Sequence, residues 1–377
     1  MAERSKVYFA NPRRTRLGGI CEKIRALWKE SGMADMIDEY DVVAVKMHFG
    51  EPGLTTYIRP IIARTVVDLV KDAGGRPVLT DTTTLYKRRR HTADSYYEAM
   101  KENGFTPETV GCPILVADGF RNNGVYVTLD RYYKLKEVKV AQVIYDADVL
   151  VSLAHITFHG DTGIAGTIKN IAMGGTCTET KLRAHSSDAK PKLVPERCIK
   201  CGICVRICPA GALSFKEKVL TLDKTLCISC GDCIAACPQG AIRVPWGMAQ
   251  QTYRGVLDQY KGVISTFREG KVGHIDIALD ITPGCDCQAP NDTPMVPNIG
   301  ILASKDGLAC DRAAFDLINA APGIPGTRAE EIGALEPGSD KFKALFPSLD
   351  MDELWRLAAE AEIGNLDYEL IDIEKGE

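Results

Sequence analysis

Eight cysteines fall into two runs with identical spacing. The first run starts at Cys198 and reads C-I-K-C-G-I-C-V-R-I-C-P, and the second starts at Cys227 and reads C-I-S-C-G-D-C-I-A-A-C-P. Each is a C-x2-C-x2-C-x3-C-P array, the spacing with which a short chain holds a four-iron cluster through thiolates. Two arrays therefore predict two [4Fe-4S] clusters.

The second array is a repeat of the first. Cys227 lies 29 residues after Cys198, and at the same offset P-A-G-A-L after the first array is matched by P-Q-G-A-I after the second. In paired arrays the fourth cysteine of each run ligates the other cluster. One predicted cluster therefore takes Cys198, Cys201, Cys204 and Cys237, and the other takes Cys227, Cys230, Cys233 and Cys208.

The segment from about Pro195 to Pro245 resembles the bacterial two-cluster ferredoxins along its whole length, and all eight ligand positions match. Zinc is the alternative metal, because C-x2-C pairs also bind zinc. A tetrahedral zinc site does not need the third cysteine or the C-P ending of each array. The spacing therefore favours [4Fe-4S] clusters over zinc.

The rest of the chain is long enough to need a hydrophobic core of its own. It has 377 residues, of which 45% are hydrophobic and 25% charged, as in an ordinary globular protein. We expect a host domain interrupted by a small insert, as compact domains with neighbouring ends allow. The predicted divisions are 1–194 and 247–377 for the two parts of the α/β host domain, and 195–246 for the ferredoxin-like insert.

Strand and helix patterns alternate in the host domain. The apolar, β-branched run at 41–49 predicts a buried strand, the periodicity at 60–74 an amphipathic helix, and 76–81 a second strand. A strand, helix and strand of these lengths form a βαβ unit, which requires a parallel sheet. The predicted fold class is α/β, with a mostly parallel sheet in the host and an inserted α+β two-cluster ferredoxin domain. A long surface loop is expected at 322–338.

Several motifs of the host domain are similar to those of a known family, the domain of unknown function 362. They are V-K-M-H-F-G-E at 45–51, T-T-Y-I-R-P at 55–60, S-L-A-H-I-T-F-H-G at 152–160, G-T-I-K-N-I-A-M-G at 166–174 and D-I-T-P-G-C-D-C at 280–287. The resemblance covers nearly the whole chain and implies the same architecture, since members often carry a two-cluster ferredoxin in this place. It implies no particular reaction.

Cysteines and histidines near predicted strand ends suggest a further site. Residues two or four apart on an extended chain share a face, and ligands collect at the carboxyl ends of parallel strands. The pattern predicts a mixed sulfur and imidazole site for a metal or cofactor. Its candidate residues are Cys285, Cys287, His48, His155 and His159. The alternatives are free loop thiols and hydrogen-bonded structural histidines, and the aspartate between the cysteines is expected to face away.

Two cationic residues are candidates for binding an anion. Lys169 lies in the glycine-rich stretch 160–175, whose backbone amides could cradle a carboxylate or phosphate, and Arg59 could assist. The stretch lacks the spacing of a nucleotide phosphate loop, so an ordinary glycine-rich loop is the competing interpretation. The run K-R-R-R at 87–90 is expected to be solvated.

Composition excludes some partners and compartments. The formal net charge is −4, which argues against nucleic acid because binding phosphate backbones needs a basic face. No apolar run reaches the roughly 18 residues of a membrane helix, and the amino terminus does not resemble a signal peptide. Fourteen cysteines in an unexported chain are expected to be thiols and ligands. We expect a cytoplasmic protein of an organism that avoids oxygen.

These features predict a redox protein that passes electrons from a partner protein through two [4Fe-4S] clusters to a small-molecule substrate or cofactor in the α/β host domain. The main alternative is an electron-transfer adaptor that docks a partner enzyme and has no catalytic site. Clusters that only brace the fold are a third interpretation, disfavoured because one cluster or zinc ion would suffice for so short a segment.

Overall fold

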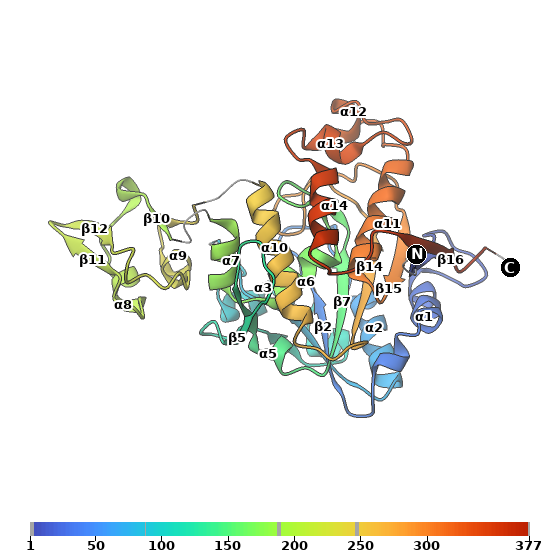
Figure 1. The fold of residues 1–377 in the computed structure, drawn as a ribbon, viewed down its shortest axis with the longest axis horizontal. Coiled ribbons are helices and arrows are strands. Elements are labelled where there is room, and N and C mark those ends of the chain that lie inside the picture. The colour runs from blue at the N-terminus through green and yellow to red at the C-terminus, as the bar shows by residue number, and fades with distance from the viewer. Residues whose placement is uncertain (1–3, 87, 187–189, 246–248, 376–377) are drawn as a thin grey trace.

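One eight-stranded sheet organises the host domain (Figure 1). The computed structural model describes residues 4–86, 88–186, 190–245 and 249–375. In spatial order the strands are β16 (Tyr368–Asp372), β1 (Ser5–Ala10), β15 (Gly300–Ser304), β14 (Val272–Ala278), β7 (Val149–His155), β2 (Val42–Met47), β3 (Arg76–Asp81) and β4 (Ile114–Val116). From β14 to β4 all neighbours are parallel, whereas β15 is antiparallel to both of its neighbours. The expectation of a mostly parallel α/β sheet is confirmed.

Helices cover both faces of this sheet. Because side chains alternate along a strand, Val43, Val45 and Met47 of β2 face one core and Ala44 faces the other. The first core includes residues of α1 (Ile20–Glu30) and α2 (Pro60–Asp72), and the second includes α6 (Thr167–Gly175), α10 (Ala249–Ile264) and α11 (Gly307–Ala320). None of the described helices combines the length and apolar character needed to cross a membrane.

Smaller elements complete the host domain. They are α3 (Ala93–Glu102), α4 (Pro107–Val110), β5 (Gly124–Thr128), β6 (Glu137–Ala141), α5 (Gln142–Tyr145), β8 (Thr157–His159), β9 (Gly163–Ala165), α7 (Thr178–His185), α12 (Arg328–Glu331), α13 (Lys341–Leu345) and α14 (Met351–Glu360), with the 3-10 turn η1 (Ala34–Met36). A second 3-10 turn, η2 (Pro195–Arg197), begins the cysteine-rich segment. The expected loop at 322–338 contains the short helix α12. The expected glycine-rich loop at 160–175 is wrong for most of its length, because it forms β9 and α6.

The cysteine-rich segment projects from the host domain beside α7 (Figure 1). It contains α8 (Ile203–Ile207), β11 (Leu213–Lys216), β12 (Val219–Leu222), α9 (Asp232–Ala236) and the short pair of β10 (Lys192–Leu193) and β13 (Ile242–Arg243). Its backbone repeats as its sequence does. Lys200 and Ser229, at equivalent positions, both adopt left-handed conformations, and α9 starts 29 residues after α8. The predicted boundary at residue 246 lies outside the described residues.

Candidate functional site

A cavity of about 460 Å³ opens where four neighbouring parallel strands end. His155 is the last residue of β7, His48 follows β2 by one residue, and Thr82 directly follows β3. The loop with Cys285 comes after β14. All four residues line the cavity. The carboxyl edge of the sheet thus collects side chains from distant parts of the chain, as expected for an open parallel sheet.

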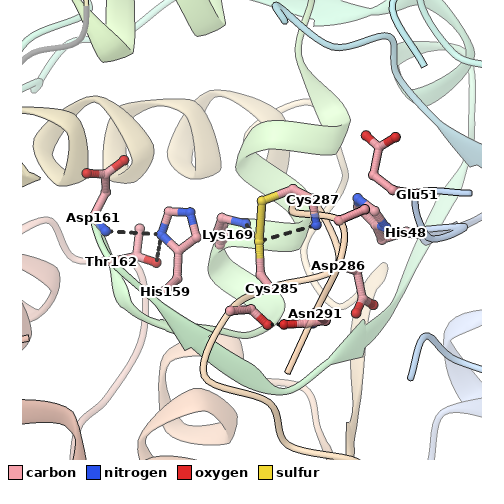
Figure 2. The surroundings of a disulfide bond; sticks show 12 residues. His48, Glu51, His159, Asp161, Thr162, Lys169, Cys285, Asp286, Cys287 and Asn291 are labelled. Atoms are coloured by element: carbon pink, nitrogen blue, oxygen red, sulfur yellow. Dashed lines mark hydrogen bonds between the residues drawn. A yellow bond between two sulfur atoms is a disulfide. The ribbon is translucent and has the colours of Figure 1, made fainter. Parts of the chain in front are cut away.

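A disulfide bond between Cys285 and Cys287 lies in the cavity wall (Figure 2). The loop that carries it is held by Asn291, whose side-chain amide donates to Thr282 Oγ1 at 2.8 Å and to the carbonyl of Gly284 at 2.9 Å. The two sulfurs therefore sit in a fixed loop and face the cavity. The expectation that both sulfurs point toward one site is consistent with this arrangement. The expectation that the cysteines are thiols and ligands is wrong for this pair, which is disulfide-bonded.

His159 is the predicted histidine that lies beside the sulfur pair. A ring nitrogen of His159 and the sulfur atoms of Cys285 and Cys287 all lie within 4.8 Å of one another. Its Nδ1 atom faces away from the sulfurs, toward Asp161 and Thr162 (Figure 2). Three of the five residues predicted for a mixed sulfur and imidazole site thus come together.

His155 lines the same cavity but cannot serve as a ligand in this arrangement. Its Nδ1 lies 2.8 Å from Asp286 Oδ2, and its Nε2 lies 2.7 Å from the carbonyl oxygen of Leu279. Burial alone would lower the pKa of His155, but the Asp286 carboxylate and the Leu279 carbonyl outweigh it, and the net shift is upward. The prediction of His155 as a ligand is corrected: Asp286 faces away from the sulfurs, as expected, and binds this imidazole.

His48 also lines the cavity but is not part of the close group formed by His159 and the two cysteines. Its Nδ1 accepts a hydrogen bond from the amide of Gly50 at 2.9 Å. Its Nε2 is buried and has no hydrogen-bond partner within the described part of the chain. Burial, reinforced by Arg90 and Lys46, lowers the pKa of His48 well below its usual value, so the ring is neutral.

Buried cations surround the cavity. Lys46 Nζ lies 3.3 Å from Asp81 Oδ1, and Lys181 Nζ donates to Thr82 Oγ1 at 2.6 Å. Burial lowers the pKa of Lys46 to about 8, although Asp81 opposes the shift. Burial also lowers the pKa of Lys169 to about 8, and the nearby Lys46 adds to the effect. A cavity with this many cations suits a ligand that carries negative charge.

Glycine at position 174 makes room for one of these cations. A Cβ atom added to Gly174 of α6 would lie 1.8 Å from Lys46 Cε and 2.5 Å from Asp81 Oδ1. Real side chains do not approach so closely. The ion pair of Lys46 and Asp81 therefore occupies space that any other residue at position 174 would fill.

The proposed anion site of Lys169 and Arg59 does not form. Lys169 lines the cavity, but Arg59 pairs with Asp280 at 2.8 Å and is not among the lining residues. The backbone amides that begin α6 are also occupied, because those of Thr167 and Ile168 donate to the Asp311 carboxylate at 2.7 and 3.0 Å. Lys169 reaches the cavity from helix α6 rather than from a glycine-rich loop.

Sequence reasoning missed the buried ion pairs at the cavity. Arg90 is 2% exposed and pairs with Glu51 at 2.7 Å, although its run of arginines was expected to be solvated. Lys46 was overlooked inside an apolar strand, although it lies two residues before His48 and shares its face. A lysine within a predicted buried strand indicates a buried ion pair from the sequence alone, because a buried charge requires a partner.

The eight cysteines of the arrays form two neighbourhoods. A small cavity of about 20 Å³ is lined by all four cysteines predicted for the first cluster, Cys198, Cys201, Cys204 and Cys237. After burial, the groups that raise the pKa of Cys233 are Cys230, Cys227 and Cys208, followed by Cys204. The fourth cysteines receive equivalent amide hydrogen bonds, from Ala212 to Cys208 at 3.3 Å and from Ala241 to Cys237 at 3.1 Å.

The second array packs against the wall of the large cavity. Leu85 lines the cavity and also belongs to a hydrophobic cluster with Cys233 and Ile234. The Thr178 hydroxyl and the Asn122 amide donate to the carbonyl of Cys230 at 3.0 and 3.3 Å. Leu85 therefore belongs both to the lining of the cavity and to the hydrophobic cluster around the thiols predicted to hold the second cluster.

Comparison with known proteins yields a family match and distant relatives. The model of the family described as domain of unknown function (DUF362) matches residues 43–316. A thylakoid-associated protein of Synechocystis sp. is 25% identical over 171 residues, which are 44% of this chain and 49% of that protein, so the match spans about half of the relative.

Two solved structures match this chain at 11% identity. The lactate racemase apoprotein of Thermoanaerobacterium thermosaccharolyticum matches with a TM-score of 0.41, over 98% of this chain and 84% of that one. A Thermotoga maritima protein matches with a TM-score of 0.35, over 71% of this chain and 51% of that one.

Proposed function

Since this chain belongs to the DUF362 family, whose description names no activity, we propose from its own residues that it is an iron-sulfur redox protein. Two [4Fe-4S] clusters in the segment 195–245 take electrons from a partner protein and pass them to the host cavity, where a small-molecule substrate is reduced. The protein works in a reducing cytoplasm. The observation that carries the proposal is the contact of the second cysteine array with Leu85 in the cavity wall.

The cavity contains a group that can accept the electrons. Breaking the bond between Cys285 and Cys287 requires two electrons, and the two sulfurs then take up two protons. Each cluster supplies one electron on oxidation, so two reduced clusters match one disulfide. The charge of Lys169, whose Nζ lies 3.4 Å from Cys285 Sγ, favours the thiolate that forms when the bond breaks.

The cation-rich lining indicates the class of substrate. Lys46, Lys169, Lys181, Arg88 and Arg90 line the cavity together with the acidic residues Asp81, Asp161 and Asp286, and Arg90 also pairs with Glu51. An anionic molecule, such as a carboxylate or phosphate ester, would gain charge-assisted hydrogen bonds there. His48, neutral and with its Nε2 unpartnered among the described residues, can hydrogen-bond the same molecule.

Counting electrons in oxygen-free protein tests the proposal. Reductive titration of the loaded protein should consume about four electrons per chain, two by the clusters and two by the disulfide. The Cys285→Ser/Cys287→Ser double variant should retain about eight irons and consume about two electrons. Thiol alkylation followed by mass spectrometry should find Cys285 and Cys287 of the parent protein disulfide-bonded before the titration and reduced after it.

The Cys233→Ser variant is the matched control for electron transfer from the second cluster to the disulfide. Lacking a second-cluster ligand, it should leave the disulfide oxidised when the electron donor reacts only with clusters. If the disulfide is reduced equally fast in that variant, the clusters do not feed the cavity. An iron-free protein purified without oxygen would overturn the proposal entirely.

A further inference from the structure

The geometry points to a metal site in the host cavity: we propose that Cys285 and Cys287, once reduced, bind a thiophilic divalent ion such as Zn²⁺ together with His159. This site is distinct from the eight array cysteines and does not depend on the clusters. Thiolate and imidazole are the ligands that zinc prefers, and two sulfurs with one nitrogen leave a fourth position open.

The distances suit a tetrahedral ion. With metal bonds of roughly 2.0 to 2.3 Å, neighbouring ligand atoms of a zinc site lie roughly 3.5 to 3.8 Å apart. The sulfur atoms and a ring nitrogen of His159 already lie within 4.8 Å of one another. Opening the disulfide lets the sulfurs separate to the required spacing while the loop, fixed by Asn291, stays in place.

The surroundings of His159 prepare it to bind. Its Nδ1 lies 3.1 Å from Thr162 Oγ1 and 3.2 Å from the amide nitrogen of Asp161, so Nε2 is the nitrogen left for a metal. The Thr162 hydroxyl donates to the carbonyl of Ile164 at 2.8 Å. Because the amide of Asp161 can only donate, Nδ1 is an acceptor in this structure and the neutral ring carries its proton on Nε2. An ion that binds Nε2 would shift that proton to Nδ1, where Thr162 Oγ1 can accept it. Hydrogen bonds of this kind orient the imidazole ligands of metal sites.

Charge and access favour an ion with an open position. Lys169 Nζ, 3.4 Å from Cys285 Sγ, stabilises the thiolate that a metal requires. All three proposed ligands line the cavity, so the fourth position faces its interior. An anionic molecule held by the cavity lysines could complete the coordination through an oxygen atom. His155 is excluded, because both of its nitrogens are engaged.

Metal binding and disulfide formation compete for the same two sulfur atoms. A disulfide contains no thiolate, so the oxidised pair cannot bind the ion. A bound ion in turn keeps Cys285 and Cys287 reduced. When a small-molecule disulfide oxidises the zinc-loaded protein, it accepts two electrons from the two thiolates and is cleaved to two thiols, while Cys285 and Cys287 form one sulfur-sulfur bond and release one Zn²⁺. The site is therefore sensitive to the redox state of the cavity.

Zinc analysis of cluster-loaded protein tests the proposal. Anaerobic protein with a reduced Cys285 and Cys287 pair should retain one Zn²⁺ per chain after dialysis, and zinc X-ray absorption should show two sulfur ligands with nitrogen or oxygen. The Cys285→Ser/Cys287→Ser variant should retain none while its iron content stays unchanged. Cys21→Ser, a cysteine substitution elsewhere in the host, should bind zinc like the parent protein.

Five further outcomes support or contradict the proposed zinc site. His159→Gln should weaken zinc binding, and Thr162→Val should weaken it by about 10 to 100-fold, whereas Thr162→Ser should restore it. Zinc that binds only to protein lacking iron, with four sulfur ligands, would place the ion on the array cysteines and overturn the proposal. Equal zinc binding by oxidised and reduced protein would overturn it as well.

Discussion

The cysteine arrays and the host cavity collect their functional side chains in opposite ways. Each proposed cluster takes three ligands from a stretch of seven residues in one array. Its fourth ligand comes from the other array, which is offset by 29 residues. The cavity takes its side chains from the ends of β2, β3, β7 and β14, and from α6, which are scattered from Lys46 to Cys287. The ligands of the proposed clusters can be recognised from their spacing in the sequence. The side chains of the cavity come together only when the sheet forms.

The difference has a physical cause. A [4Fe-4S] cluster is held by thiolates that lie close together in the chain. The short spacing between these cysteines can therefore be recognised in the sequence. A cavity at a sheet edge gathers residues by topology, and its buried charges need partners that the sheet brings from elsewhere. Substitutions in the arrays should therefore act locally, while those in the cavity should affect the stability of the whole host domain.

The largest expected effect is a loss of iron from the arrays that leaves the host domain folded. Replacing Cys233 by Ser should lower the iron content from about eight to about four atoms per chain, while the host domain keeps its fold. Iron analysis and circular dichroism would measure both. The matching replacement of Cys112, a buried cysteine of the host, should leave the iron unchanged. Loss of the host fold in the Cys233 variant would contradict the local character of the array.

Adjacent arginines give the second comparison. Glu51→Ala should lower the free energy of unfolding by about 3 to 5 kcal/mol, because it leaves the buried Arg90 without its nearest carboxylate. The control is Glu102→Ala, which removes the exposed partner of Arg89 and should cost about 1 kcal/mol or less. Urea unfolding of the host domain measures both. Equal effects would show that the Arg90 pair is not as buried as described.

The third prediction concerns pH. The pKa of Lys46 is about 8 in the folded protein, against an ordinary value of 10.5, so the unfolded chain binds more protons between these values. The free energy of unfolding of the parent protein, relative to Lys46→Met, should therefore rise by on the order of 3 kcal/mol from pH 8 to pH 10.5. Unfolding titrations at several pH values would measure it. A flat difference would mean that Lys46 keeps its ordinary pKa.

The smallest effect is expected where the two regions touch. Leu85→Ala truncates a side chain that lines the cavity and packs with the second array, and we expect reduction of the disulfide between Cys285 and Cys287 to change by only a few-fold while the iron content stays the same. Stopped-flow reduction would measure the rate. Leu115→Ala, at a leucine that is 41% exposed, is the control. A complete block in the Leu85 variant would indicate that the second array had left the host.

Much of the fold could be predicted from the sequence, because alternating strand and helix patterns dictate a parallel sheet. The eight array ligands and the pair Cys285 and Cys287 could also be proposed, since each set is compact in the chain. Helix α6 was misread as a loop because glycines usually break helices, and its glycines here make close packing possible. His155 was misassigned because spacing places a ring on a face without saying which acceptors surround it.

The part of the site that spacing could not supply is the set of buried charges. Arg90 and Glu51 are 39 residues apart and are joined only by the folded sheet edge. Lys46 is stabilised by Asp81 and by Asn170, which belong to different elements. Pairings of this kind depend on tertiary contacts, so a single sequence indicates only that a buried charge must have a partner.

Gly174 carries a consequence for any attempt to make this protein more robust. Exchanging a helical glycine for alanine ordinarily stabilises a protein by roughly 0.5 to 1 kcal/mol, and an engineer would choose this position early. Here the added methyl group would take the place of the Lys46 ammonium. The exchange would stabilise the helix but displace the Lys46 ammonium from the cavity. A relative with alanine at position 174 would therefore be expected to lack the ion pair of Lys46 and Asp81.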